Sequence, residues 1–287
     1  MYEDILLPYD GSEGATAVLD HAADIARWAD ATVHVLFVAD TTRHSVTVIE
    51  GEAVDGLVRQ GEDIVAEAAD RLQSRAVSHE TDVVQGNPAP TIASYAERYG
   101  LDLVVMPTHA REGISRYLIG SVTEKVVRLS SVPVLTARMH PDEHLAFPYE
   151  NVLVPTDGSE GAALATEHGL ALVAALDATL HGLSVVEDAP FGPDVRSVTS
   201  REAGKEAAEE ALDDLEAMAE EHALEDVVRH VMVGSPVEGI LSCVDEHDVD
   251  AVVMGTTGRQ GTDRILLGSV AEKSVRSVPV PVITVGA

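Results

Sequence analysis

Cysteine is almost absent from this sequence, whose 287 residues include only Cys243. A single cysteine cannot form a disulfide within the chain, and sparse cysteine is typical of reducing compartments. No apolar run approaches the about 18 residues that a membrane-spanning helix needs, and the chain does not open with the basic and apolar regions of a secretory signal. We therefore expect a cytoplasmic protein that does not bind membranes, with Cys243 packed as a small apolar residue on a helix.

Aromatic residues are also scarce. They make up 3% of the chain, whereas hydrophobic residues together make up 45%. This content is sufficient for sizeable cores, which must be built mainly from valine, leucine, isoleucine and alanine. A chain of 287 residues has the usual length of about two domains.

Positive charge is the third scarcity. Lysine and arginine number 19 against 49 aspartate and glutamate residues, which gives a net charge of -30, and the lysines are Lys125, Lys205 and Lys273. Such a surface repels nucleic acids and anionic membranes, so we expect neither as a partner. The acids could form a partner-binding face or the surface of a halophilic protein. Because they are spread along the whole chain, we favour the halophilic interpretation.

The sequence repeats itself once. Residues 5–14, ILLPYDGSEG, match residues 152–161, VLVPTDGSEG, and the same order of motifs follows in each half. The later matches join Gly120-Ser121 to Gly268-Ser269, and residues 132–136 to residues 280–284. Two copies are too few for a stacked-repeat solenoid, and each copy has the length of a self-sufficient domain.

We predict two domains, at residues 1–138 and 150–287, joined by a polar linker at residues 139–149. The linker contains His140 and His144, which could be considered as metal ligands. Pro141 lies between them and no third ligand is nearby. We therefore interpret both histidines as solvated linker residues.

Each copy alternates short aliphatic runs with amphipathic helical stretches. This alternation predicts βαβ units and an open parallel sheet with helices on both faces. The prolines Pro133, Pro279 and Pro281 favour an edge position for the last strand of each copy. In the second copy we expect strands near 150–155, 178–185, 227–233, 250–254 and 281–285, and helices beginning near Ser159, Ser200, Pro236 and Ser269.

Two loops of the second copy contain the residues that indicate a ligand-binding site. One comprises residues 155–159 after the first strand, and the other runs from Gly255 to Ser269 after the fourth strand. Ligands of open parallel sheets bind outside the carboxyl ends of the strands, where the winding direction reverses. One pocket can use both loops if the first and fourth strands are neighbours.

The second loop has the features of a phosphate site. Gly255 and Gly258 would allow close backbone approach and positive φ, and a helix beginning at Ser269 would offer free N–H groups and a positive dipole end. Arg259 and Arg264 add positive charge. The sequence has neither a GxxxxGK[ST] phosphate loop nor an obvious base to activate water, so we do not expect fast nucleotide hydrolysis.

A purely structural interpretation of the same residues is also available. Ser269 with Glu272, and Ser121 with Glu124, have the spacing of a capping box. Such caps would be used with or without a ligand, so glycine-rich loops alone are weak evidence for nucleotide binding.

The combined motifs are more specific. Gly255-x2-Gly258-x9-Gly268-Ser269, together with Pro155-Thr156-Asp157-Gly158-Ser159, resembles the ATP-binding branch of the universal stress protein family. The resemblance covers nearly the whole chain as two tandem domains. It implies five-stranded, Rossmann-like parallel sheets of strand order 3-2-1-4-5, with Asp157 on the ribose side and Val185 on the adenine side. The nucleotide-binding residues it implies are Pro155, Thr156, Asp157, Val185, Met254, Gly255, Gly258, Arg259, Gly268 and Ser269.

The resemblance also implies the ligand and the assembly. The expected cofactor is ATP, with AMP or ADP as alternatives and with Mg²⁺ or Mn²⁺ held through the phosphates. Family members commonly dimerise through their last strands, so residues 132–136 and 280–284 could pair within one chain, with a further homo-oligomer as an alternative.

The first copy retains a degenerate form of the site. Pro107 replaces the first loop glycine and Ala110 the second. Proline has no N–H to offer, and alanine would carry a Cβ into the loop. We therefore expect one nucleotide per chain, in the second domain; the alternative is that the first loop rebuilds around Pro107 and still binds. The counterpart residues that remain are Asp10, Val38, Arg111, Gly120 and Ser121.

The sequence thus predicts a nucleotide-binding protein of stress response or signalling, with an unknown signalling partner and with slow hydrolysis or none. One rival is a nucleotide-independent interaction module of the same fold. Another is an adenylating enzyme, which would need a Ser-Gly-Gly-x-Asp-Ser type loop where this chain has Asp-Gly-Ser-Glu-Gly. We expect no catalytic residues and no metal site formed by protein ligands.

Overall fold

A computed structural model describes residues 1–41, 52–108, 119–138, 145–187, 195–224, 227–256 and 267–286. The chain divides into two compact units, Met1–Phe147 and Pro148–Ala287. In the parts of the chain that the structure describes, no helix combines the length and the apolarity needed to cross a membrane.

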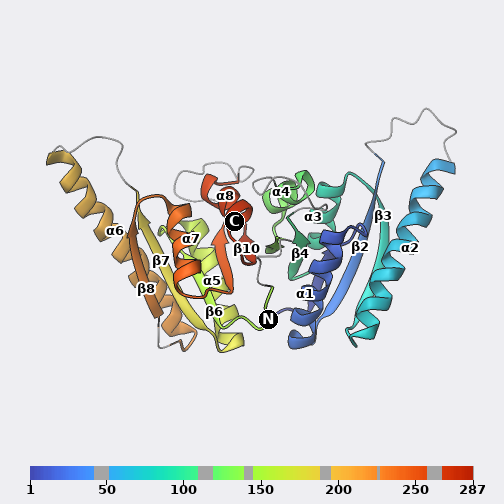
Figure 1. The fold of residues 1–287 in the computed structure, drawn as a ribbon, viewed down its shortest axis with the longest axis horizontal. Helices are drawn as coiled ribbons and strands as arrows, with labels where there is room; N and C mark the ends of the chain where they lie inside the picture. The colour runs from blue at the N-terminus through green and yellow to red at the C-terminus, as the bar shows by residue number, and fades with distance from the viewer. Residues whose placement is uncertain are drawn as a thin grey trace. The chain divides into compact units, whose positions relative to one another are not determined.

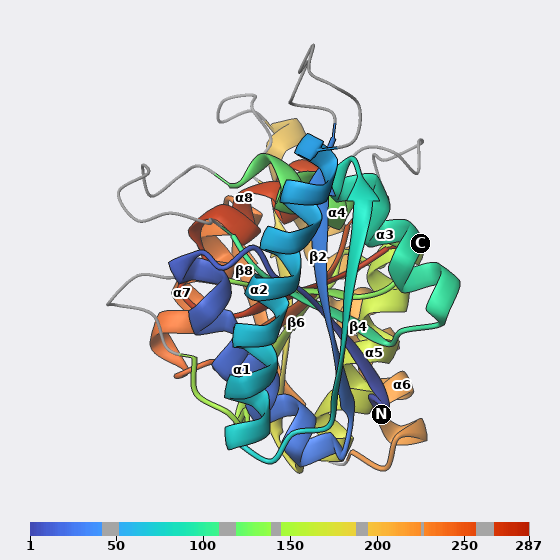
Figure 2. The same cartoon turned by 90° about the vertical axis from the view of Figure 1, so that its right-hand side faces the viewer.

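The first unit is an open sheet of five parallel strands in the order β3-β2-β1-β4-β5 (Figure 1). Helix α2 lies over strands β2 and β3 of this sheet (Figure 2). Along the chain the elements are β1 Asp4–Pro8, α1 Glu13–Ala29, β2 Thr32–Asp40, α2 Glu52–Ser74, β3 His79–Gly86, α3 Pro88–Tyr99, β4 Leu103–Pro107, α4 Ser121–Leu129 and β5 Val134–Ala137.

The second unit repeats this topology. Its strand order is β8-β7-β6-β9-β10, again parallel throughout, so the predicted order 3-2-1-4-5 is present in both copies. Its elements are β6 Asn151–Pro155, α5 Glu160–Leu176, β7 Thr179–Val186, α6 Val195–Glu221, β8 Val227–Val233, α7 Pro236–Glu246, β9 Ala251–Gly255, α8 Ser269–Ser277 and β10 Val282–Val285.

Helices cover both faces of the second sheet. A Cβ added to Gly182 of β7 would contact Leu212 and Leu215 of α6, whereas Val185, three residues further along the strand, packs against Gly239 of α7. Successive strand residues point to opposite faces, so α6 and α7 lie on opposite sides of β7. Helix α5 packs with α6 and helix α8 packs with α7, which completes one layer on each face.

The cores are aliphatic, as the composition predicts. Every residue of β4 is buried, as are the first four residues of β9. Cys243 is buried on helix α7, where burial raises the pKa of its thiol to about 11. The burial of this side chain confirms its interpretation as a packed apolar residue.

One predicted helix boundary is wrong. Helix α6 begins at Val195 rather than near Ser200. Residues 195–199, VRSVT, contain no glycine or proline, so nothing in this segment prevents the helix from extending toward its amino terminus.

Candidate functional site

The loop after strand β6 is a tight turn that leads directly into helix α5. Asp157 Oδ1 accepts a hydrogen bond from the Ser159 N–H at 3.0 Å, and Thr156 Oγ1 accepts one from the Gly158 N–H at 3.2 Å. Gly158 has a φ of +72°, which glycine adopts without the clash of a Cβ. Ser159 then caps α5 by accepting the Ala162 N–H at 3.2 Å. The turn holds the exposed Asp157 carboxylate at the carboxyl edge of the sheet.

Strand β9 ends beside this loop. Strands β6 and β9 are hydrogen-bonded neighbours, and both are parallel, so their carboxyl ends meet at one edge of the sheet. The condition for a shared pocket, that the first and fourth strands lie side by side, is therefore met.

Gly255 is the last residue of β9, and the structure requires a glycine there for a different reason from the one expected. The backbone of Gly255 is that of a strand, and its φ is not positive. Instead, a Cβ at this position would lie 2.5 Å from the Gly161 carbonyl oxygen and 2.9 Å from its carbonyl carbon. Gly255 therefore allows the close approach of β9 to the first turn of α5.

A backbone hydrogen bond joins the two described ends of the segment between β9 and α8. The Gly268 N–H donates to the carbonyl oxygen of Thr256 at 2.7 Å, and Thr256 in turn donates its N–H to Val285 at 3.0 Å. The buried Thr256 is thus an anchor that the sequence analysis did not single out. Because this bond ties Gly268 to the end of β9, helix α8 begins at the carboxyl edge of the sheet.

The predicted capping boxes are wrong. The N-cap of α8 is Gly268, with φ −61° and ψ 145°, and Ser269 is the first helical residue. Likewise, Gly120 is the N-cap of α4. A serine at the first helical position cannot cap in the expected way, so the exposed Ser269 side chain is not occupied by a capping-box bond.

The remaining predicted residues are distributed as follows. Val185 is partly exposed near the carboxyl end of β7, whereas Met254 is buried in β9, 4% exposed. The structure thus brings residues of the Pro155 loop, β7, β9 and the start of α8 to one edge of the sheet. Gly258 and Arg259, together with Arg264, lie outside the described residues.

The first unit has the same framework. Asp10 Oδ1 accepts the Ser12 N–H at 3.0 Å, and the Gly120 N–H donates to Thr108 at 2.7 Å, as their counterparts do in the second unit. Asp10 and Ser121 are exposed, and Val38 is partly exposed near the end of β2. The predicted Arg111 and the substituted Ala110 lie outside the described residues.

Two side chains distinguish the described parts of the two sites. Pro107 ends β4 where Gly255 ends β9, and Tyr9 occupies the position of Thr156. Tyr9 is 3% exposed and its hydroxyl lies 2.9 Å from Thr16 Oγ1, so the larger residue is accommodated by packing onto α1. The proline has not displaced the anchor, because Thr108 still donates to Ala137 at 2.9 Å.

The model of the universal stress protein family matches residues 1–138 and 148–286. The chain belongs to the universal stress protein family. Universal stress protein MJ0531 of Methanocaldococcus jannaschii is 34% identical over 141 residues, which cover 48% of this chain and 83% of that protein. Universal stress protein YxiE of Bacillus subtilis is 30% identical over 148 residues, 48% of this chain and 100% of the relative.

One solved structure covers both units of the chain. The crystal structure of a universal stress protein from Archaeoglobus fulgidus covers 99% of this chain, and this chain covers 98% of it, with a TM-score of 0.75 and 25% identity. Both halves of this chain therefore have a counterpart in a single universal stress protein of known structure.

The second universal stress protein unit offers three kinds of contact at one edge. The exposed Asp157 carboxylate can accept hydrogen bonds, and the partly exposed Val185 has an apolar side chain. The first intrahelical bond of α8 runs from the Glu272 N–H to Gly268, so the N–H groups of residues 269–271 have no acceptor within the helix. Free N–H groups at a helix amino terminus favour an anion.

Proposed function

We propose that the second unit binds an adenine nucleotide, with ATP as the expected ligand and AMP or ADP as alternatives. The observation that carries the proposal is the Gly268–Thr256 hydrogen bond of 2.7 Å, which fixes the start of α8 to the end of β9. Phosphates at that helix terminus and a sugar beside Asp157 would then lie at neighbouring positions of one sheet edge.

Each group of the ligand has a partner in this arrangement. The N–H groups of residues 269–271 and the exposed Ser269 hydroxyl suit phosphate oxygens, and the Asp157 carboxylate suits ribose hydroxyls. Val185 suits the flat face of adenine. Pro155 and Thr156 shape the turn, and Gly255 ends β9 beside it. Gly258 and Arg259 follow in the sequence, and Arg259 adds positive charge. Mg²⁺ or Mn²⁺ would be held by the phosphates.

The proposed role is nucleotide-dependent stress response or signalling in the cytoplasm, with slow hydrolysis or none. In this proposal the nucleotide acts by changing contacts with a signalling partner. The nucleotide-independent scaffold is the alternative function, in which the loop glycines serve packing alone. The close approach of Gly255 to Gly161 is the observation that favours that alternative.

The proposed domain boundaries are residues 1–138 and 150–287, with a linker at 139–149. Pairing of the last strands within the chain, or between chains in a homo-oligomer, is proposed because β5 and β10 each pair with one strand of their own unit. A strand at the end of the strand order of its own unit can pair with a further strand.

The first unit is proposed to bind nucleotide weakly or not at all. Asp10, Gly120 and Ser121 retain the positions of their counterparts, and Val38 retains the position of Val185. The difference then rests on Pro107 and Ala110, with Arg111 as a retained cation.

Mass spectrometry of the small molecules released when the purified protein is denatured tests the proposed function. We expect an adenine nucleotide, present in the wild type and depleted in Asp157→Ala. Protein purified without nucleotide and unable to take up ATP, ADP or AMP at millimolar concentration would support the scaffold function instead.

A further inference from the structure

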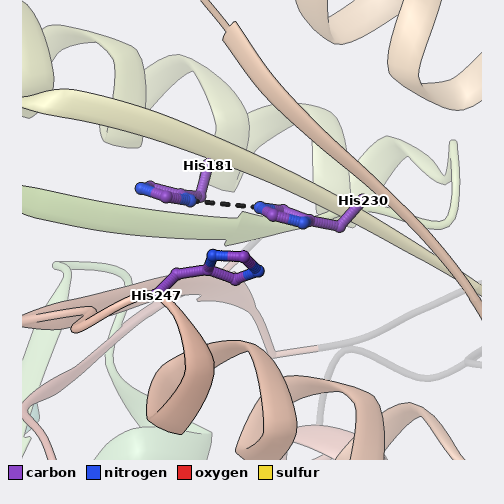
Figure 3. A group of neighbouring side chains, drawn as sticks. All are labelled: His181, His230 and His247. Carbon is purple, nitrogen blue, oxygen red and sulfur yellow. Dashed lines mark hydrogen bonds between the residues drawn. The ribbon is translucent and has the colours of Figure 1, made fainter.

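Three histidines of the second unit converge although they are distant in the sequence. His181 comes from strand β7, His230 from the neighbouring strand β8, and His247 directly follows helix α7 (Figure 3). One candidate ligand atom from each lies within 4.8 Å of those from the other two. The ring centroids of His230 and His247 are 4.4 Å apart, and those of His181 and His230 are 5.3 Å apart.

The fold places these rings on one face of the sheet. Leu183 is the register partner of His230, and His181 precedes Leu183 by two residues on β7, so both histidines point toward the face that α7 covers. His247 caps the end of α7, where its N–H donates to Cys243 at 3.1 Å. His181 is 5% exposed, whereas His230 and His247 are partly exposed. The cluster therefore has a buried base and a side accessible from solvent.

A hydrogen-bond relay orients the two strand histidines. The Asn151 side-chain oxygen lies 3.3 Å from His181 Nε2. Because an amide oxygen can only accept a hydrogen bond, this contact favours the tautomer with the proton on Nε2 and a lone pair on Nδ1. That Nδ1 lies 3.1 Å from His230 Nε2. A tetrahedral zinc ion with Zn–N bonds of about 2.0–2.1 Å holds its nitrogen ligands about 3.3–3.4 Å apart. The two nitrogens are thus already separated by nearly the required distance, and Asn151 fixes the tautomer as an outer partner commonly does.

We propose that His181, His230 and His247 bind one divalent transition-metal ion of the zinc class, with a fourth position open to solvent. Imidazole is a preferred ligand of Zn²⁺, Ni²⁺ and Cu²⁺, whereas Mg²⁺ and Ca²⁺ prefer oxygen ligands. The metal would take the place of the proton between His181 Nδ1 and His230 Nε2. A modest rotation of the His247 side chain would bring in the third nitrogen.

Burial acts on the pKa values of both strand histidines, and one nearby carboxylate acts in the opposite direction on His230. Burial, with the neighbouring His230 and His247, lowers the pKa of His181 to about 4, and burial also lowers the pKa of His230. Glu246 acts in the opposite direction on His230, because its negative charge favours a positive group nearby. The negative charge of Glu246 would also attract a metal ion.

The corresponding place in the first unit serves as an internal comparison. His34 occupies the register position of His181, but its Nε2 lies 2.7 Å from Asp4 Oδ1 and its Nδ1 3.7 Å from Glu80 Oε2. Asp82 and Tyr99 stand where the second unit has His230 and His247. The first unit therefore has a histidine–carboxylate pair instead of three imidazoles.

The site is separate from the proposed nucleotide site. His181 and Val185 are four residues apart on β7, which corresponds to about 13 Å along a strand. The metal would instead join β7, β8 and the end of α7, three elements that come together only in the folded unit. It would therefore stabilise the folded second unit by mass action.

Zinc binding to the full chain provides the test. Protein stripped with a chelator is titrated with Zn²⁺ in the presence of millimolar Mg²⁺, which occupies oxygen-rich surface sites on this acidic protein. We expect one zinc ion per chain and a higher unfolding temperature. His230→Gln and His247→Gln should each weaken binding by about a hundredfold or more, while the unfolding midpoint of the metal-free protein stays close to that of the wild type.

Two matched controls separate this site from adventitious binding. His34→Gln removes the equivalent histidine of the first unit, and His222→Gln removes a histidine of the second unit that lies 3.1 Å from Glu167. Both should leave zinc affinity unchanged. Cobalt substitution should give the visible absorption of nitrogen-coordinated, tetrahedral Co²⁺ in the wild type. Absence of a tight zinc site, or equal affinity in the wild type and both cluster variants, would overturn the proposal.

Discussion

A Cβ atom placed on Gly255 would lie 2.5 Å from the carbonyl oxygen of Gly161, in the first turn of helix α5. The contact is with backbone, which cannot rotate away as the end of a side chain can. Gly255 is therefore required by the packing of β9 on α5, whatever ligand the neighbouring loop holds. A nucleotide-binding role for this glycine has to be tested separately from its role in the fold.

Gly255→Ala should destabilise the second unit by about 1–3 kcal/mol, the usual cost of overpacking a core. Gly56→Ala is the comparison, because a Cβ at Gly56 of α2 would meet nothing within 4 Å. That change should be neutral or should stabilise the first unit by up to about 1 kcal/mol. Urea unfolding followed by circular dichroism measures both. A Gly255→Ala protein as stable as the wild type would show that the close approach is not maintained in solution.

Asp157→Ala should weaken ATP binding by about ten- to a hundredfold, because it removes a charge-assisted acceptor for the ribose hydroxyls. The fold should persist, since Ser159 still caps α5 through its own side chain. Asp10→Ala removes the same turn bond in the first unit and should leave ATP affinity unchanged. Isothermal titration calorimetry compares the three proteins. Equal affinity for Asp157→Ala and the wild type would exclude Asp157 as a nucleotide contact.

Acid should destabilise both units through one pair of equivalent histidines. Burial lowers the pKa of His21 in α1 to about 4, against the opposing charge of Asp24, and burial lowers the pKa of His168 in α5 to about 4. Since the unfolded chain takes up these protons near pH 6.5, stability is full above that pH and falls between about pH 6.5 and 4. Each histidine contributes up to about 3 kcal/mol to this loss.

His21→Gln tests the pH effect in the first unit. The ring centroid of Phe147 lies 5.7 Å from that of Trp28 and 6.1 Å from that of His21. Because Trp28 is the single tryptophan of the sequence, tryptophan fluorescence reports on this region. Between pH 6.5 and 4 the free energy of unfolding should fall less steeply in the variant than in the wild type. The difference in slope should correspond to about one proton taken up on unfolding. Because carboxylates titrate in both proteins, the difference between the two curves isolates the histidine. Parallel curves would contradict a neutral, buried His21.

Molar KCl should raise both the stability and the ATP affinity of this protein. At a net charge of -30, repulsion among acids dominates, and raising the salt from about 0.1 M to 1 M shortens the screening length from about 10 Å to about 3 Å. Local ion pairs oppose this trend. Arg229, for example, lies 2.6 Å from Glu209 and 2.8 Å from both Asp213 and Glu216. Unfolding midpoints across a KCl series, with sucrose as a non-ionic control, measure the balance; full stability in dilute buffer would contradict the halophilic interpretation.

Strands and their order were predictable from the sequence, but the caps of α4 and α8 were not. Continuous aliphatic runs mark buried parallel strands, as in β9, and the family motif implied the strand order. The cap of α8 is Gly268 and not the predicted Ser269, because a tertiary hydrogen bond to Thr256 fixes the glycine in an extended conformation. No local pattern contains that bond.

The histidine cluster was not predictable for a related reason. His181 and His230 meet through the register of two strands, and His247 joins them through the packing of α7. Their spacing in the sequence matches no metal-binding motif. The packing reason for Gly255 is equally non-local, since Gly161 lies in a different element.

The stoichiometry of ATP binding to the full chain tests the central claim most directly. Equilibrium dialysis with labelled ATP should give one site per chain. Gly258→Ala should lower the ATP affinity of that site, whereas Ala110→Gly, the matched position in the first unit, should not. Unchanged ATP affinity in Asp10→Ala and an affinity about ten- to a hundredfold weaker in Asp157→Ala would place the site in the second unit. Two equivalent sites in the wild type, or a single site abolished by Asp10→Ala, would contradict the account.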